Sequence, residues 1–337
     1  RILGGDPMGA TQLNHGRQAE ELIEAGMMLD LTDVAEAGGW ADIVNPSSLL
    51  NSCTLDGRIY CVPVNIHSAQ WLWLSHDAYE KAGLDVPADW NEFVASAPAL
   101  EAAGMVPLAM GQQGWQQNLA FGAITIAVAG LDAWRDVTVN KNADTARGPE
   151  YAAVFEAVAN ARELARESNV QDWNQATNMV ITGQAGAQLM GDWAQGEFSV
   201  AGQVEGQDYS CLPGLGLNAI LDTGGDAFYF PANDDPEITA AQKELAALLI
   251  SPEVQVSFNL AKGSLPVRGD IDMAAANGCM QKGLGILADG GILPSGDQSL
   301  SADTQTQIED LMAEFWSGDM PAADAQARYA DLIASAD

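Results

Sequence analysis

One stretch of the chain combines ligand-recognising residue types with a backbone suited to presenting them. Residues 188–198 read Gln-Leu-Met-Gly-Asp-Trp-Ala-Gln-Gly-Glu-Phe. We expect a short strand leaving the core, a sharp turn at Gly191 and a helix from Ala194, with Asp192 as its N-cap. In many α/β proteins a strand, a glycine turn and a helix present a side chain at the edge of a cleft. Trp193 either lines such a cleft or fills the core, and this stretch alone favours neither.

A second stretch, residues 111–118, surrounds Trp115 with amides, including Gln116 and Gln117. Amides both donate and accept hydrogen bonds, and an aromatic ring covers the apolar face of a sugar. This loop therefore suits a neutral polyhydroxyl ligand. The alternative is a loop whose amides face water before an apolar helix over 119–128.

Further polar residues stand at the ends of expected strands. Asn65 and His67 stand at the end of an expected strand over 57–66, and Asp226 follows the turn Gly224-Gly225 before a strand over 227–230. The sequence thus offers carboxylate, amide and imidazole groups at turn positions.

Other chemistry-bearing residues have structural explanations. Trp71 and Trp73 alternate within the apolar run 69–74, which places both on one face and favours core packing. His15 either points into a cleft or satisfies the turn after a short strand over 11–13, and we favour the turn.

The elements that must position these residues alternate between strands and helices. Ser251-Pro252-Glu253 combines an N-cap, a proline and an acidic first turn, which predicts a helix start. Helices are also expected near 150–168, 240–250, 301–316 and 321–336. This alternation predicts an α/β fold. A length of 337 residues suits two domains, without repeats, low-complexity tracts or a long linker.

The composition excludes several partners. With 14 basic and 46 acidic residues, the formal net charge is −32, and such a surface repels nucleic acid and anionic lipid. No apolar run approaches the roughly 18 residues of a membrane span. The first residues, Arg1 to Asp6, do not resemble a signal peptide.

The four cysteines form no Cys-x-x-Cys pair and no metal-ligand pattern with histidine. Their even, sparse number fits two disulfides in an oxidising compartment. Cys53 with Cys61 would close a short loop, and Cys211 with Cys279 would join distant segments. Four buried free thiols are the alternative.

Catalytic and metal motifs find no support. There is no Gly-x-Ser-x-Gly, no phosphate-binding loop, no EF-hand and no His-Glu-x-x-His. A glycosidase carboxylate pair stays open because acidic residues are numerous, although nothing singles out a pair. We predict no catalytic residues, no metal and no cofactor.

The chain resembles the sugar-binding family 1 of extracellular solute-binding proteins that serve bacterial ABC importers, with the glucose/hexose-binding branch as its nearest part. The matching segments occur in order along nearly the whole chain. They are residues 57–67, Asp172-Trp173-Asn174-Gln175-Ala176, Met190-Gly191-Asp192-Trp193-Ala194, Ser251-Pro252-Glu253 with Phe258, and residues 262–268.

This resemblance implies a bilobal periplasmic-binding-protein fold, type II-like, whose lobes close over a sugar. It implies an N-terminal lobe of residues 1–68 plus 227–267 and a C-terminal lobe of 69–226 plus 268–337. Crossings are expected near 68–71, 223–230 and 266–270.

Function and site follow from the same resemblance. We expect a monomeric, secreted periplasmic protein that captures a neutral mono- or oligosaccharide, with a glucose-like hexose favoured, and delivers it to an ABC permease. Trp173 and Trp193 would contact the sugar ring, while Asp226 and Lys262 would bond hydroxyls. Asn65, His67, Trp115, Gln116 and Gln117 would line the cleft.

Two departures from the family pattern affect these expectations. Family members carry an N-terminal strand–helix–strand before the segment matching 4–7, which is absent here, so we expect residues preceding Arg1. The hexose branch has a histidine near the segment matching 291–295, where this chain has none. A secreted glycoside-processing enzyme and an adhesive surface protein are the alternative functions.

Overall fold

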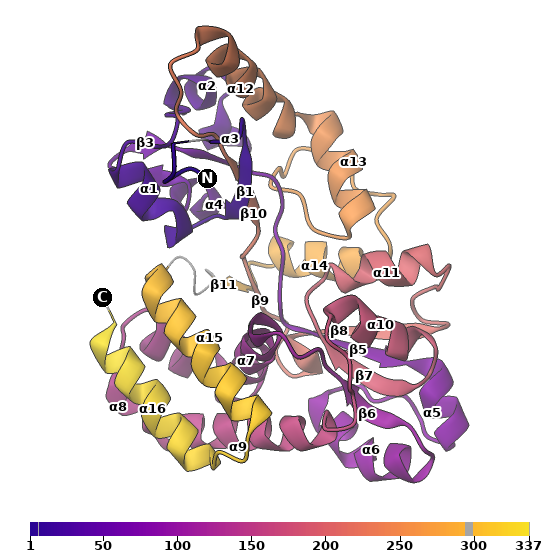
Figure 1. The fold of residues 1–337 in the computed structure, drawn as a ribbon. Helices are drawn as coiled ribbons and strands as arrows, with labels where there is room; N and C mark the ends of the chain where they lie inside the picture. The colour runs from indigo at the N-terminus through magenta and orange to yellow at the C-terminus, as the bar shows by residue number, and fades with distance from the viewer. Residues whose placement is uncertain (6, 294–298, 337) are drawn as a thin grey trace. The chain divides into compact units, whose positions relative to one another are not determined.

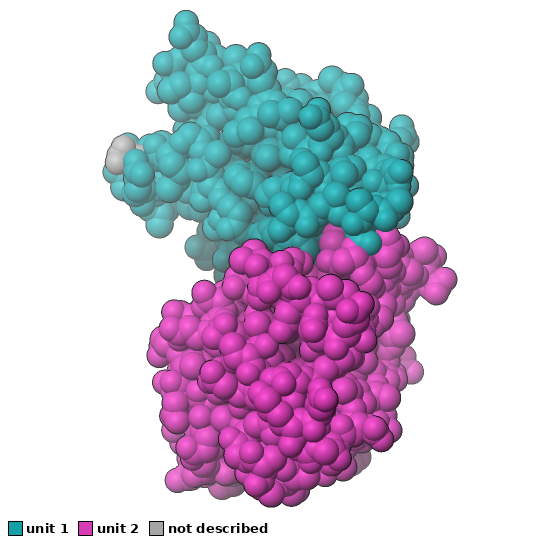
Figure 2. Space-filling view, turned by 90° about the vertical axis from the view of Figure 1, so that its right-hand side faces the viewer, with its two compact units in different colours: residues 1–67, 223–276, 294–302 teal, residues 68–222, 277–293, 303–337 magenta. Residues whose placement is uncertain are grey.

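In the computed structural model, residues 1–5, 7–293 and 299–336 are described, and they divide into two units (Figure 2). Unit 1 comprises Arg1–His67, Thr223–Ala276 and Pro294–Ala302, and unit 2 comprises Ser68–Asp222, Asn277–Leu293 and Asp303–Asp337. Residues 268–276, expected in the C-terminal lobe, cluster with unit 1. Within this unit Arg268 pairs with Val44 in a β-bridge, and its Nη1 donates to the carbonyl oxygen of Ile250 at 2.9 Å.

Unit 1 is built on a three-stranded antiparallel sheet (Figure 1). Its order is β1 (Thr11–Asn14), β10 (Asp226–Tyr229), β4 (Cys61–Pro63). The register places Asn14 opposite Asp226 and Ala227 opposite Pro63. This sheet therefore brings the first strand of the chain to a strand more than 200 residues later.

A disulfide ties a small hairpin to this sheet. Strands β2 (Thr54–Leu55) and β3 (Arg58–Ile59) pair through a turn at Asp56 and Gly57, where φ is positive at both residues. Cys53, before the hairpin, is bonded to Cys61 of β4. Both cysteines lie in a core that also contains Ala227 and Tyr229.

Helices complete unit 1. They are η1 (Arg17–Ala19), α1 (Glu20–Glu24), α2 (Thr32–Ala37), α3 (Trp40–Ile43), α4 (Ser48–Asn51), α12 (Pro236–Leu249) and α13 (Pro252–Lys262). The predicted start of α13 is confirmed, because Ser251 is its N-cap and accepts from the Val254 N–H at 3.4 Å. Gly263, with φ of 80°, ends this helix in the left-handed conformation.

Unit 2 is built on a four-stranded mixed sheet. Its order is β6 (Val106–Ala109), β7 (Ala185–Leu189), β5 (Trp71–Ser75), β8 (Tyr209–Pro213). The pair β6–β7 is parallel, and β5 is antiparallel to both β7 and β8. Two short strands, β9 (Leu221–Asp222) and β11 (Ile292–Leu293), pair in parallel elsewhere in the unit.

The helices of unit 2 include α7, α8, α9 and α16, which lie beside one another in Figure 1. The set is α5 (His76–Ala82), α6 (Trp90–Ala102), α7 (Gly114–Thr138), α8 (Ala143–Ala146), α9 (Pro149–Leu164), α10 (Trp173–Ile181), α11 (Ala194–Val200), η2 (Gly214–Gly216), α14 (Gly278–Ala288), α15 (Ala302–Ser317) and α16 (Ala322–Ser335). Helix α7 breaks at Gly130, where φ is 78°. Asn218 donates to the carbonyl oxygens of Ile126 and Ala127 just before that break.

The expected core role of Trp71 and Trp73 is confirmed. Both are buried on β5, and their ring centroids lie 5.8 Å apart. Trp73 Nε1 donates to the carbonyl oxygen of Met190 and Trp71 Nε1 donates to Ser68 Oγ, so both indole N–H groups are paired.

Each unit combines a sheet with helices, which confirms the predicted α/β class. Among the described residues, every helix is too short or too polar to cross a membrane.

Candidate functional site

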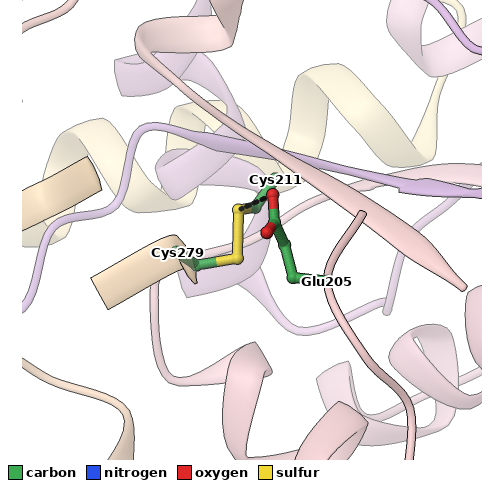
Figure 3. Close-up of side chains that lie close together, drawn as sticks. All are labelled: Glu205, Cys211 and Cys279. Carbon is green, nitrogen blue, oxygen red and sulfur yellow. Dashed lines mark hydrogen bonds between the residues drawn. A yellow bond between two sulfur atoms is a disulfide. The ribbon is translucent and has the colours of Figure 1, made fainter. Parts of the chain in front are cut away.

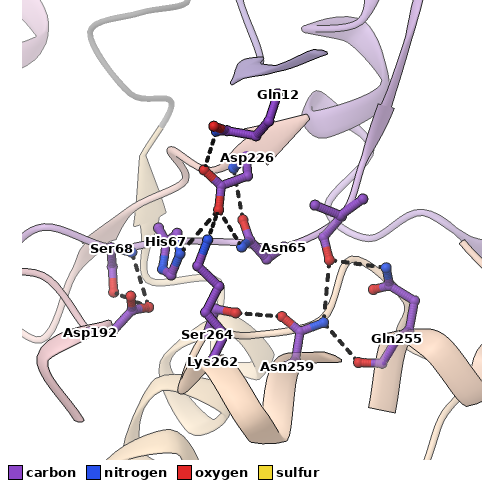
Figure 4. Close-up of polar contacts among 11 residues, drawn as sticks. Gln12, Asn65, His67, Ser68, Asp192, Asp226, Gln255, Asn259, Lys262 and Ser264 are labelled. Atoms are coloured by element: carbon purple, nitrogen blue, oxygen red, sulfur yellow. Dashed lines mark hydrogen bonds and ion pairs between the residues drawn. The ribbon is translucent and has the colours of Figure 1, made fainter. Parts of the chain in front are cut away.

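Asp226 is the centre of a polar cluster in unit 1 (Figure 4). It opens β10 directly after Gly224 and Gly225, and its residue is 9% exposed. Its Oδ2 accepts from Asn65 Nδ2 at 2.9 Å, lies 3.4 Å from His67 Nε2 and pairs with the Lys262 ammonium. The structure therefore brings together four of the residues expected to bind a ligand.

The cluster keeps Asp226 ionised. Burial alone would raise the pKa of Asp226, but hydrogen bonds and charge from His67, with the bonds from Lys262 and Asn65, outweigh it and hold the pKa well below its ordinary value. The carboxylate can therefore act as a charged acceptor at any physiological pH.

Lys262 supplies a donor at the same place. It is the last residue of α13, where a cation is favoured by the helix dipole, and its side chain is 38% exposed. An ammonium has three N–H groups, and of the described residues Asp226 is the acceptor that Lys262 engages. A solvent-accessible donor thus stands beside a charged acceptor, which is the pairing that a hydroxyl group recognises.

Buried amides hold α13 against the end of β4. Gln255 Nε2 and Asn259 Nδ2 both donate to the carbonyl oxygen of Val64, at 3.0 and 3.3 Å. Asn259 Oδ1 in turn accepts from Ser264 Oγ at 2.6 Å (Figure 4). These bonds fix the helix end that carries Lys262.

Unit 2 carries the three expected tryptophans on a single apolar cluster. Trp115, Trp173 and Trp193 are partly buried and pack against the core that contains Trp71 and Trp73. The rings of Trp115 and Trp193 are 6.3 Å apart between centroids and tilted by 47°. Each of the three tryptophans is thus partly accessible on this aromatic cluster.

Trp193 folds back over Gly191. A methyl group at position 191 would lie 2.2 Å from ring carbon Cζ3 of Trp193, so a glycine is needed for space. The predicted N-cap role of Asp192 is wrong, because α11 begins with Trp193 at its N-cap position and has no side-chain cap. Asp192 is buried instead, and its Oδ2 accepts from the Ser68 N–H at 3.2 Å.

Trp115, Gln116 and Gln117 lie in the first turns of α7 and not in the predicted loop. Gln113, the N-cap residue, accepts from Trp115 Nε1 and Gln116 Nε2, each at 2.9 Å. Gln116 and Gln117 are buried, and their Oε1 atoms have no hydrogen-bond partner among the described residues.

Hydrogen bonds join the start of α7 to the start of α10. Gln113 Nε2 donates to Asp172 Oδ1 at 3.0 Å, and Asp172 forms a capping box with Gln175 at the start of α10. Trp115, in the first turn of α7, and Trp173, the first residue of α10, are therefore held near each other by the contact between these two helix starts.

Sequence reasoning missed Gln12 and Gln113. Gln12 Nε2 donates to Asp226 Oδ1 at 2.5 Å, a contact that depends on the pairing of β1 with β10. Nothing local in the sequence reveals that pairing. Gln113 could have been found, because it precedes the helix that the sequence does predict.

Both expected disulfides are present, and the free-thiol alternative is wrong. Cys53 pairs with Cys61 and Cys211 with Cys279. Glu205 lies beside the second pair (Figure 3) and binds Lys282 Nζ at 2.8 Å. Because both sulfurs are bonded to each other, this Glu-Cys-Cys group offers no thiolate ligands to a metal.

The family's hexose branch has a histidine near the segment matching residues 291–295, of which 294 and 295 lie outside the described residues. The sequence itself has no histidine there.

Comparison with known proteins gives consistent results. The family model described as bacterial extracellular solute-binding protein matches residues 3–256. A "Probable sugar-binding periplasmic protein" of Brucella melitensis biotype 1 is 32% identical over 286 residues, which are 84% of this chain and 67% of the relative. An "Uncharacterized ABC transporter extracellular-binding protein" of Pyrococcus horikoshii is 27% identical over 277 residues, covering 80% of this chain and 60% of the relative.

Among solved structures, a "Chitin oligosaccharide binding protein" superposes with a TM-score of 0.82 at 20% identity, covering 99% of this chain and 85% of the other. That likeness shows a shared fold. These relatives are binding proteins and not enzymes. The extent of the family match and the identity to the Brucella relative establish that this chain belongs to the bacterial extracellular solute-binding proteins.

Proposed function

We propose that this protein captures a neutral mono- or oligosaccharide in the periplasm, with a glucose-like hexose favoured, and delivers it to an ABC permease. It acts as a monomer whose two lobes close on the sugar. The lobes have about the expected bounds, residues 1–68 plus 227–267 and 69–226 plus 268–337, except that residues 223–226 and 268–276 go with the first lobe, as they do in unit 1. The names of its relatives, sugar-binding periplasmic and ABC-transporter extracellular-binding proteins, support this class of function.

The observation that carries the proposal is the buried Asp226 carboxylate beside the accessible Lys262 ammonium. A carboxylate oxygen accepts from one sugar hydroxyl while an ammonium donates to the next, and each such bond is charge-assisted. Oδ1 of Asp226 has one donor among the described residues, Gln12, so it has capacity for a second. A misplaced hydroxyl would leave this buried charge incompletely paired, which makes the cluster selective between epimers.

The charge of the cluster favours a neutral ligand. The negative charge of Asp226 is balanced by the adjacent Lys262, so the pair has no excess charge to offer an ion. The protein as a whole carries a net charge of −32, which repels anionic solutes at long range.

The aromatic surface of unit 2 supplies the apolar half of sugar recognition. Trp193, Trp115 and Trp173 present partly buried rings on one cluster. The C–H face of a pyranose packs on such rings, while its hydroxyls are bound by amides and charged groups.

The test is a titration of the purified protein with D-glucose, D-galactose, D-xylose, maltose, D-glucuronate and the acyclic alcohol sorbitol, followed by tryptophan fluorescence. We expect a saturable change with at least one neutral sugar, a smaller response to D-glucuronate and none to sorbitol. No response to any of the neutral sugars would contradict the proposal. Size-exclusion chromatography at micromolar concentration is expected to give a monomer.

A further inference from the structure

His15 is a buried histidine to which the ligand contacts above assign no role. It follows β1 and is fully buried, and its backbone N–H donates to the carbonyl oxygen of Gly225 at 3.2 Å. Gly225 immediately precedes Asp226, so His15 packs against the turn that presents the carboxylate. Burying an imidazole costs free energy of folding, because its polar nitrogens lose their hydrogen bonds to water.

The hydrogen bonds of Ser52 fix the protonation of the His15 ring. Ser52 Oγ donates its single proton to the carbonyl oxygen of Leu49 at 2.6 Å, and it lies 3.0 Å from His15 Nδ1. The hydroxyl must therefore accept from the imidazole, so Nδ1 carries the proton and a neutral ring leaves Nε2 bare. Burial lowers the pKa of His15 to about 4. His67 also lowers this pKa, while Asp226 and the Gly224 backbone raise it by a smaller amount.

The other edge of the His15 ring meets Gly225, and Asn65 meets the same glycine. A methyl group at position 225 would lie 2.9 Å from His15 Nε2, 2.3 Å from the Asn65 carbonyl oxygen and 3.0 Å from Asn65 Oδ1. Gly225 is not among the residues with positive φ, so its lack of a side chain serves space and not backbone conformation. The imidazole and the Asn65 residue thus both pack against Gly225.

Asn65 is the residue that orients Asp226. Its Nδ2 donates to Asp226 Oδ2 at 2.9 Å, and its Oδ1 accepts from the Asp226 backbone N–H at 2.8 Å. The same amide therefore holds both the backbone and the carboxylate of Asp226. Movement of Asn65 or of the Gly225 turn would displace the charged acceptor.

We propose that His15 is a positioning residue of the sugar site: anchored by Ser52, its ring holds the Gly225 turn, against which Asn65 also packs, and through that turn the Asp226 carboxylate. This inference rests on the proposed function, because Asp226 needs accurate placement only if it binds a ligand. His15 itself does not touch the ligand.

A double-mutant cycle tests this role. His15→Asn keeps an N–H donor near the place of Nδ1 but removes the ring edge that meets Gly225. His76→Asn, at a half-buried histidine of unit 2, is the matched control. With D-glucose as the probe, we expect His15→Asn to weaken binding at least fivefold and His76→Asn less than twofold. In an Asn65→Ala background, His15→Asn should change the affinity less than twofold further, because the Gly225 turn that His15 holds positions Asp226 together with Asn65. The proposal would be overturned if His15→Asn weakened binding by the same factor in the wild type and in the Asn65→Ala background, or if His15→Asn left the affinity of the wild type unchanged.

Ser52→Ala is the second variant, for the case that His15→Asn does not fold. It leaves the ring in place without its anchor, and we expect at least a threefold loss of D-glucose affinity. Ligand-free crystal structures of the wild type and of each folded variant separate this inference from the proposed function. The two Asn65–Asp226 hydrogen bonds should be present in the wild type and broken or lengthened in the variants. Their retention in every variant would refute the positioning role even if the wild type bound no sugar, whereas the absence of sugar binding alone would refute only the proposed function.

Discussion

Replacing Asp226 by asparagine tests the centre of the candidate site with a change of a single atom. The carboxylate is surrounded by donors: Asn65 Nδ2, His67 Nε2 and Lys262 Nζ at Oδ2, and Gln12 Nε2 at Oδ1. An asparagine has one acceptor oxygen, and its NH₂ group must then face at least one of these donors. Asp226→Asn therefore removes the charge and also creates a repulsive donor–donor contact.

The size of the effect on sugar affinity follows from the bond that is lost. Hydrogen bonds to charged groups contribute about 1.5–3 kcal/mol each. If one sugar hydroxyl donates to Asp226, its loss weakens binding roughly 10- to 150-fold, since about 1.4 kcal/mol corresponds to tenfold. Reorientation of Lys262, which loses its anionic partner, would add to this value.

Isothermal titration calorimetry of the wild type and the variant with the sugar that the wild type binds measures the effect. Asp33→Asn is the matched control, because Asp33 also pairs with a lysine, Lys243, at 2.6 Å, but on the surface of unit 1. We expect the control to bind as the wild type does, since exposed ion pairs contribute little. Equal affinities for Asp226→Asn and the wild type would remove Asp226 from the site and refute the argument built on it.

Three further predictions follow. Trp193→Ala should weaken sugar binding at least tenfold while the circular dichroism spectrum is retained, and a loss of folding without a separable binding defect would make Trp193 a core residue. Replacing both Cys211 and Cys279, which are 68 residues apart, by serine should lower the free energy of unfolding by about 4 kcal/mol on the chain-entropy model, measured by urea unfolding of the variant and the wild type, and no change would count against a stabilising bond. For His15, whose pKa is lowered to about 4 from an ordinary 6.5, the unfolded state gains its proton first as the pH falls. Stability should therefore be intact above pH 6.5 and fall by up to about 3 kcal/mol between pH 6.5 and 4, and urea unfolding of His15→Asn should lack that part of the pH dependence.

Local signals in the sequence predict individual elements well. The Ser251-Pro252 start of α13 depends on groups within one helical turn, and the structure has that cap. The alternation of Trp71 and Trp73 predicts a buried strand because the period of two is a property of the strand itself. Such features need no knowledge of distant residues.

Features that depend on tertiary contacts could not be predicted in this way. Asp192 has the residue type of an N-cap, but Ser68, more than 100 residues earlier, offers its N–H to the same carboxylate. Gln12 and His15 join the Asp226 cluster only because β1 pairs with β10. Asp226 and Lys262 were identified through the family resemblance, since no local pattern distinguishes them from the other charged residues.

A crystal structure of the protein with its bound sugar tests the central claim most directly. We expect sugar hydroxyl oxygens within hydrogen-bond distance of Asp226 Oδ1 and Lys262 Nζ, with the pyranose ring packed against Trp193. A sugar bound elsewhere, with the Asp226–Lys262 pair untouched, would contradict it.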